Sequence, residues 1–93
     1  MTKITLDRYV LDVLMRDLVG HDRSPSAFLV YLHLGIHTGT AKISHQQMAE
    51  ATGLSKSAVQ KGIRLLERRK LIRVRRESVT AVPEYVVLRP WRR

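Results

Sequence analysis

Basic and polar side chains recur along residues 55–69 at intervals that suit the binding of an anionic ligand. On a helix that turns 100° per residue they share one face, and the apolar residues of the segment share the opposite face. The polar face consists of Lys56, Ser57, Gln60, Lys61, Arg64, Glu67 and Arg68. Ordinary solvated helix faces mix both signs of charge to form i,i+4 pairs, whereas this face holds a single acid. We therefore expect it to contact phosphate groups.

Two other patterns fit chemistry less well. His33 and His37 are four residues apart on an apolar stretch, a spacing that suits a metal, but no cysteine or carboxylate follows nearby to complete a ligand shell. Asp7, Asp12 and Asp17 recur every five residues, which does not align them on one helix face. No nucleophile–base pair and no glycine-rich phosphate loop is visible. We expect no metal, no cofactor and no enzymatic activity.

The distribution of charge supports an anionic partner. The chain has a formal net charge of +9. Residues 1–50 hold five basic and five acidic residues, so the whole excess lies in residues 51–93, with twelve basic and three acidic residues. A neutral part followed by a strongly basic part is typical of a scaffold that carries a polyanion-binding surface, and solubility alone would not require this asymmetry.

Length and composition predict one small domain. The 93 residues are sufficient for a single core, and the absence of cysteine excludes disulfides, thiolate chemistry and cysteine-based zinc sites. The longest apolar run, residues 27–32, is far shorter than the roughly 20 residues of a membrane span. No signal peptide is visible. We expect a cytoplasmic protein without a membrane partner.

Apolar spacing predicts two helices before residue 40. The first covers residues 6–18, and residues 20–23 read as a turn. Ser24 followed by Pro25 is a helix-start signal, an N-cap serine with proline at the first helical position. The helix that follows runs to about His37, is apolar around most of its circumference and should form the centre of the core. Gly39 is expected to end it.

The second half predicts two short helices and a hairpin. Residues 41–43 form a short, extended link, and Ser44 with Gln47 fits a capping box. This helix ends near Gly53, and Ser55 caps the next, which runs to about Arg69. From Leu71 the period becomes two, which indicates a strand, and a second strand is expected over residues 85–88. Residues 77–83 would form the hairpin loop.

The segment from His45 to Arg64 carries the strongest pattern. Two short helices meet at a tight turn that contains Gly53, which is the helix-turn-helix arrangement. Ala49 is small enough to let the two helices approach, and Val59 faces inward. A helical hairpin in any all-α core gives the same pattern, so that alternative stays open here.

The stretch ISHQQMAEATGLSKSAVQKGIRLLERRKLIRVRR resembles the winged helix-turn-helix domains of bacterial and phage DNA-binding proteins, such as MarR-type regulators and replication initiators. The preceding SPSAFLVYLHLGIHTG resembles the first core helix of these domains, so the resemblance covers about residues 24–90. It implies a mostly α fold with a small β-hairpin wing, in which a three-helix core carries an additional N-terminal helix. It also implies sequence-specific binding of double-stranded DNA, most simply in transcriptional regulation, and with it a nucleoid-associated location in the cytoplasm.

By this resemblance, the helix from Ser55 enters the major groove, where lysine donates to guanine and glutamine pairs with adenine. The residues placed at base edges are Ser55, Lys56, Ser57, Gln60 and Lys61. Arg64 and Arg68, further along, are placed at phosphates. Gln46 and the backbone N–H groups near Ser44 are a further phosphate contact.

The resemblance also implies that the wing adds contacts through Arg73, Arg75 and Arg76. Either Arg75 or Arg76 would reach the minor groove or the flanking backbone. Wing tips of such domains often carry glycine, but residues 78–83 read SVTAVP. This apolar tip puts a minor-groove role in doubt and instead favours packing, for instance against a second subunit. For the basic tail, two alternatives stay open: a phosphate clamp and a disordered end. The tail contains Arg89, Trp91, Arg92 and Arg93.

We expect a helical extension over residues 1–23, the winged helix-turn-helix domain over residues 24–90 and a basic tail over residues 91–93. The N-terminal helix either covers its own core or pairs with a twin. We favour a homodimer, because the N-terminal helix and the wing tip are apolar. Helix-turn-helix proteins also commonly dimerise to read two half-sites about 34 Å apart. The alternative function is a protein–protein adaptor or a DNA-binding component of a replication or partition assembly. RNA binding has little support because few aromatic residues are available for stacking, and the sequence identifies no small-molecule effector.

Overall fold

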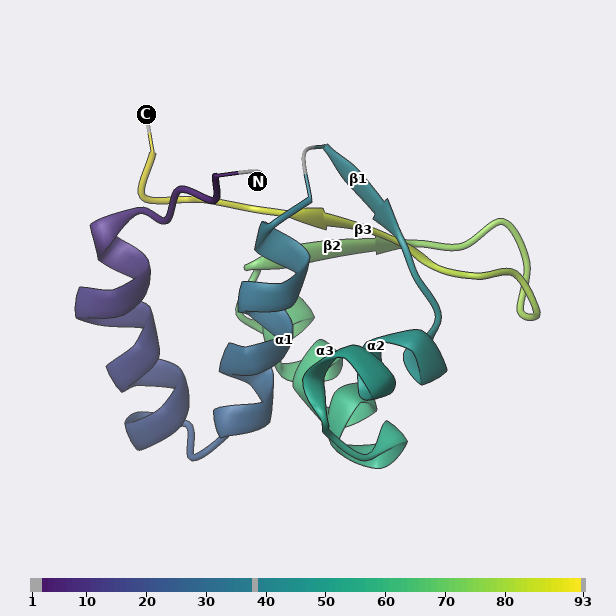
Figure 1. The fold of residues 1–93 in the computed structure, drawn as a ribbon, viewed down its shortest axis with the longest axis horizontal. Coiled ribbons are helices and arrows are strands. Elements are labelled where there is room, and N and C mark those ends of the chain that lie inside the picture. The colour runs from purple at the N-terminus through teal and green to yellow at the C-terminus, as the bar shows by residue number, and fades with distance from the viewer. Residues whose placement is uncertain (1–2, 38, 93) are drawn as a thin grey trace.

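The computed structural model describes residues 3–37 and 39–92, and their fold is a winged helix-turn-helix with an additional N-terminal helix (Figure 1). Residues 8–21 are helical and include two segments with wider i→i+5 hydrogen bonding, η1 (Val10–Leu14) and η2 (Arg16–His21). The three core helices are α1 (Pro25–Gly35), α2 (His45–Thr52) and α3 (Lys56–Arg68). The strands are β1 (Thr40–Lys42), β2 (Ile72–Arg75) and β3 (Glu84–Val87).

Each core helix begins at the serine that the sequence predicts as its cap. Ser24 Oγ accepts from the Ala27 N–H, and Pro25 occupies the first turn of α1. At α2 the capping box is complete, because Ser44 Oγ accepts from the Gln47 N–H at 3.0 Å and the Gln47 side chain accepts from the Ser44 N–H at 2.9 Å. Ser55 Oγ accepts from the Ala58 N–H at 3.0 Å. These caps satisfy N–H groups that have no partner inside the helix.

The sheet contains one more strand than the predicted hairpin. The strand order is β1–β3–β2 with both pairs antiparallel, so the expected extended link over residues 41–43 lies at the edge as β1. Tyr85 in the central strand is paired with Ala41 on one side and Val74 on the other. The predicted alternation in β2 is confirmed, because Ile72 is buried and Arg73 and Arg75 are exposed.

The core is a layer between α1, the N-terminal helix, the helix-turn-helix pair and the inner face of the sheet. The N-terminal helix packs on one side of α1, and α2 and α3 lie on the other, as Figure 1 shows. α1 is central, as the sequence predicts. Its buried residues are Ala27, Phe28, Val30, Tyr31 and Leu34.

Two helix boundaries differ from the prediction. The first helix covers residues 8–21 in place of 6–18, so Gly20 and His21 are helical and Leu6 lies outside the helix, 42% exposed. The reason is that its buried residues, Val10, Leu14 and Leu18, begin later than Leu6. α1 ends at Gly35 rather than near His37, although Gly39 does have the positive φ (79°) expected of a terminating glycine.

Candidate nucleic-acid interface

The helix-turn-helix is formed by α2, a glycine turn and α3. Gly53 has a φ of 79° and donates its N–H to the Ala49 carbonyl, which ends α2 in a conformation that residues with a side chain rarely adopt. Ala49, Met48 and Val59 are buried between the helices. The chain therefore turns within a few residues and brings α3 to the surface with a fixed orientation.

α3 lies against α1 at one very close point. A Cβ atom on Gly62 would stand 3.1 Å from the Ala27 Cα and 3.2 Å from its nitrogen, closer than most Cβ atoms approach backbone. The buried side of α3 continues with Ile63 and Leu66. Because this side is fixed on α1, the opposite side of α3 must face outward.

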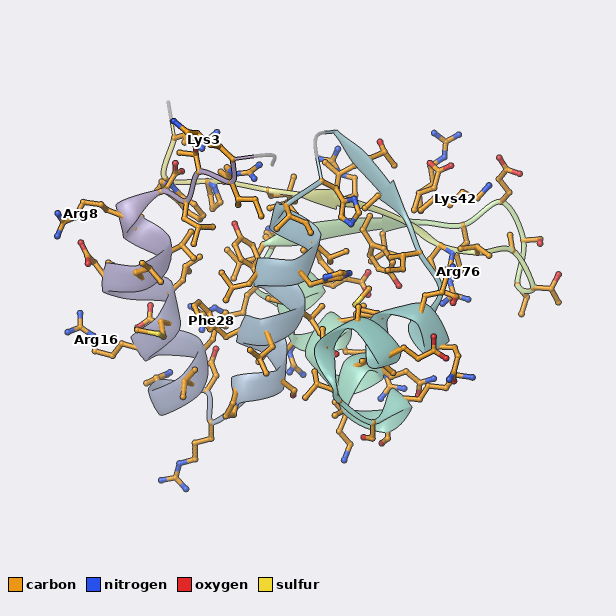
Figure 2. The ribbon with its side chains drawn as sticks, viewed as in Figure 1. Lys3, Arg8, Arg16, Phe28, Lys42 and Arg76 are labelled. Atoms are coloured by element: carbon orange, nitrogen blue, oxygen red, sulfur yellow. The ribbon has the colours of Figure 1, made fainter. Side chains whose placement is uncertain are left out.

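The outer side of α3 carries the residues that the sequence places at DNA. Ser55, Lys56, Ser57, Lys61, Arg64 and Arg68 are exposed, and Gln60 is half-buried. Among the described residues, no carboxylate forms an ion pair with any of the four cations of this helix face. Figure 2 shows the side chains in place on the ribbon. The face therefore keeps its positive charge available for a partner.

Two other cations of the basic half are neutralised within the protein. Arg69, just after α3, pairs with Asp22 and lies 3.8 Å from Asp17, so it ties this end of α3 to the N-terminal helix. In the tail, Arg92 pairs with Asp7 over 2.6 Å. The four aspartates of residues 1–50 thus pair with basic residues that lie outside the α3 face.

Of the two alternatives for the basic tail, the disordered end is wrong for residues 91 and 92, and the phosphate clamp stays a prediction. The Trp91 indole stacks on Tyr9 with ring centroids 4.6 Å apart and donates to Asp7, which also pairs with Arg92. These contacts order the segment against the N-terminus, and Asp7 pairs with Arg92, whose side chain is 56% exposed. The segment is ordered because Asp7, a carboxylate far away in sequence, accepts hydrogen bonds from both residues. The prediction for Arg93 lies outside the described residues.

The wing presents its arginines on two sides. Arg73, Arg75 and Arg76 are exposed, and the Arg76 guanidinium donates to the Val79 carbonyl over 3.5 Å. The tip is apolar and open to solvent, since Val79 is 90% exposed. Gln46 on α2 is also exposed, but its amide donates to Glu50 on the same helix at 3.1 Å.

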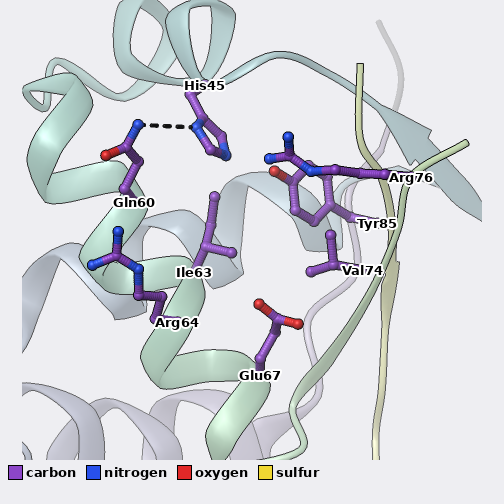
Figure 3. Close-up of a pocket in the computed structure, with 8 residues that line it drawn as sticks. All are labelled: His45, Gln60, Ile63, Arg64, Glu67, Val74, Arg76 and Tyr85. Carbon is purple, nitrogen blue, oxygen red and sulfur yellow. Dashed lines mark hydrogen bonds between the residues drawn. The ribbon is translucent and has the colours of Figure 1, made fainter. Parts of the chain in front are cut away.

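A cavity of about 480 Å³ lies between α3 and the wing, and no pattern in the sequence predicts it. Its lining comes from the start of α2, the middle of α3, the central strand and the wing (Figure 3). The lining residues are His45, Gln60, Ile63, Arg64, Glu67, Val74, Arg76 and Tyr85. Three of them, Gln60, Arg64 and Arg76, belong to the predicted DNA-binding set.

His45 and Tyr85 are the polar residues of this cavity that sequence reasoning missed. Burial, followed by the charges of Arg76, Lys56 and Arg64, lowers the pKa of His45 below its ordinary 6.5. Its Nδ1 lies 3.3 Å from the Gln60 amide nitrogen. Burial raises the pKa of Tyr85 to about 12, so its hydroxyl keeps its proton at neutral pH. Each is unremarkable in sequence, and only the packing of the sheet against α2 and α3 brings them together.

Elsewhere, the described residues offer little for other chemistry. His33 and His37 lie edge to face with ring centroids 5.7 Å apart, and within the ranges that the structure covers no group of three or more potential ligands gathers around a point. In the same ranges, no helix has the length and apolar character needed to cross a membrane.

Comparison with known proteins agrees with this geometry. A family model described as a helix-turn-helix domain matches residues 24–72, which span α1, β1, α2, α3 and the start of β2. Neither the search of curated proteins nor the search of solved structures returned a match. The match covers more than half of the chain and includes both helices of the turn and the core helix that supports them. The chain belongs to the helix-turn-helix domain family, whose characteristic function is to bind DNA.

Proposed function

We propose that this protein binds double-stranded DNA in a sequence-specific manner and regulates transcription, without enzymatic activity of its own. In the proposed complex, α3 enters the major groove. The residues that face base edges are Ser55, Lys56, Ser57, Gln60 and Lys61. Five arginines contact phosphates or the minor groove. Gln46 adds a phosphate contact from α2. The arginines are Arg64, Arg68, Arg73, Arg75 and Arg76. The domain over residues 24–90 binds DNA, and the helical extension over residues 1–23 joins two copies of the chain.

The observation that carries the proposal is the unpaired positive face of α3. Lys56, Lys61, Arg64 and Arg68 are exposed, and no described carboxylate neutralises them, whereas Arg69 and Arg92 are paired. Four lone cations on one rigid helix repel each other in the free protein. This repulsion is relieved when phosphates approach and release their counterions.

The test is a titration of duplex DNA at two salt concentrations. Affinity should fall steeply with salt, with a slope that corresponds to roughly five to eight neutralised phosphates. Lys56→Glu with Lys61→Glu should abolish binding and leave the fold intact, because both residues are exposed. Arg8→Glu with Arg16→Glu on the N-terminal helix is the matched control, since it changes net charge equally. Selection from a random duplex pool then checks specificity, and equal binding of all duplexes would contradict the proposed base contacts.

We also propose that two copies associate through the N-terminal helix. Leu11, Met15 and Val19 lie four residues apart along its outer side and are 47%, 42% and 37% exposed. Exposed apolar patches of this kind are typical of interaction sites, and dimers place two recognition helices on successive half-sites. The apolar wing tip at Val79 is a second candidate for contact with a partner subunit.

Sedimentation of the wild type and of Met15→Glu tests the homodimer. We expect the wild type to be dimeric at micromolar concentration and the variant to be monomeric, with reduced affinity for a two-site duplex. Arg16→Glu, at an exposed neighbouring position, should remain dimeric. If the wild type is monomeric and Met15→Glu keeps full affinity for DNA, the stripe serves a different protein. The adaptor role in a replication or partition assembly then replaces the homodimer.

A further inference from the structure

The cavity between α3 and the wing has a strongly cationic lining. Arg64 reaches it from α3 and Arg76 from the wing, while Lys56 acts on His45 from the start of α3. Glu67 is the single carboxylate among the lining residues, and Figure 3 shows it at the opposite end of the cavity from His45. The end between His45, Arg64 and Arg76 is therefore suited to an anion.

Tyr85 supplies a second and independent observation. Its side chain is 1% exposed, and its hydroxyl lines the cavity but has no hydrogen-bond partner among the described residues. An unpaired buried hydroxyl destabilises a folded protein, so such groups are uncommon, and one beside a cationic cavity is available to a ligand. The hydroxyl keeps its proton at neutral pH and can donate it to an acceptor that enters the cavity.

We propose that this cavity is a phosphate-binding site, in which the Arg64 and Arg76 guanidinium groups, the Tyr85 hydroxyl and the His45 imidazole bind one phosphodiester of the DNA backbone. The proposal rests on the function proposed above and extends it to His45 and Tyr85. Arginine presents paired N–H donors that match phosphate oxygens, and the phenol O–H adds a short, charge-assisted bond. Glu67 repels the anion from the far end and so favours the end near His45.

His45 makes this site sensitive to pH. It faces Gln60, Lys56 and Arg64 from α3 and Arg76 from the wing, with Glu67 beyond them, and in the free protein it is neutral at pH 7 because its pKa is lowered. A bound phosphate would raise that pKa, so binding takes up a proton. Affinity should therefore rise as pH falls through the pKa of the bound form and level off below that of the free form.

Two variants remove single functional groups without disturbing the core. Tyr85→Phe keeps the buried ring and deletes the hydroxyl; Tyr9→Phe, at the opposite side of α1, is its control. We expect Tyr85→Phe to raise the melting temperature of the free protein and yet to weaken duplex binding about tenfold, the usual loss for a hydrogen bond to a charged group. His45→Gln should abolish the dependence of affinity on pH, whereas His21→Gln, at an exposed position, should preserve it.

Two probes identify the source of the phosphate. The first probe is inorganic phosphate, and its binding is monitored through the NMR resonances of the His45 imidazole. Addition of phosphate should raise the pKa of His45, and the rise should be smaller in Arg76→Ala. The second is a duplex with one neutral methylphosphonate at a time. At one position, this change should weaken wild-type binding but add nothing to the loss already caused by Tyr85→Phe. A different outcome is that the losses from methylphosphonate and from Tyr85→Phe add at every position of the duplex, while His45 still responds to inorganic phosphate. That outcome assigns the site to a free phosphate-type anion and overturns the contact with the DNA backbone.

The outcomes separate this site from the function as a whole. If the wild type binds duplex DNA as expected, but Tyr85→Phe and His45→Gln match their controls and phosphate leaves His45 unchanged, the phosphate site is refuted and DNA binding stands. If no duplex binds, the phosphate titration still decides whether the cavity takes an anion. Glu67→Gln gives a test of opposite sign, because removing its charge should tighten phosphate and duplex binding a few-fold.

Discussion

The indole nitrogen of Trp91 donates a hydrogen bond to the Asp7 carboxylate over 2.9 Å, although the two residues are 84 positions apart. The same carboxylate pairs with Arg92, and Tyr9 stacks on the indole. This cluster of Asp7, Tyr9, Trp91 and Arg92, here called the terminal clasp, fastens the C-terminal segment to the start of the N-terminal helix. It explains how that helix is held on α1 by more than its own apolar side.

The terminal clasp predicts a specific loss of stability in acid. The hydrogen bonds from Arg92 and Trp91 lower the pKa of Asp7 from 3.8 to about 2. A carboxyl whose pKa is lowered in the folded state stabilises it above the pKa of the unfolded state, and this contribution disappears as pH falls through the folded value. Asp7→Asn should therefore melt at a lower temperature than the wild type above about pH 5, and the difference should shrink steadily as pH falls towards 2.

Thermal melts of both proteins between pH 2 and pH 7 measure this effect. Asp12→Asn is the control, because Asp12 pairs only with the exposed Arg8 at 3.2 Å and should change the melting temperature little at any pH. A constant difference between wild type and Asp7→Asn across the whole range would show that the clasp depends on shape rather than on charge.

The close contact between Gly62 and Ala27 predicts that a methyl group added at residue 62 would force α3 away from α1. Gly62→Ala should destabilise the fold by about 1–3 kcal/mol, because the new Cβ meets backbone at 3.1 Å. Gly35→Ala is the control, since a Cβ there meets nothing within 4 Å. Denaturant titration should show a loss for the first variant and little change, or a gain, for the second. Equal stabilities would contradict the close approach.

Lys70 predicts a substitution that stabilises the protein. It has a φ of 58° at the end of α3, where its N–H bonds the Glu67 carbonyl and the Leu71 N–H bonds the Leu66 carbonyl. This is the Schellman arrangement, in which glycine is the preferred residue at the left-handed position. Lys70→Gly should therefore raise the free energy of unfolding by about 1 kcal/mol, whereas Lys70→Ala, which keeps the strain, should not. Denaturant titration of the two variants makes the comparison.

Local signals in the sequence predicted most of the fold, and long-range contacts were the part that they missed. Ser24, Ser44 and Ser55 each lie next to the helix they cap, so their role depends on a few neighbouring residues. The pairing of β1 with β3 joins residues more than 40 positions apart, and periodicity does not specify such a partner. The terminal clasp is the extreme case, because nothing near Asp7 in sequence indicates an indole.

The same distinction applies to the candidate site. The cationic face of α3 follows from helical spacing alone and could be predicted residue by residue. The cavity could not, because His45 and Tyr85 come from different elements and are ordinary in their own segments. Their proximity depends on how the central strand packs against the helix-turn-helix pair, which is a property of the assembled core.

Arg68 and Arg69 provide the sharpest contrast between binding and stability, because they are neighbours of the same type. Arg68 is exposed and forms no ion pair with the described carboxylates, whereas Arg69 pairs with Asp22, whose side chain is 13% exposed. Arg68→Ala should leave stability nearly unchanged and reduce the salt slope of duplex binding by about one. Arg69→Ala should leave that slope unchanged and destabilise the fold by about 1 kcal/mol, since its side chain is 35% exposed and solvent weakens the pair. Salt titrations and denaturant titrations of both variants test the pair together. Reversed roles would mean that Arg69, rather than Arg68, meets the DNA.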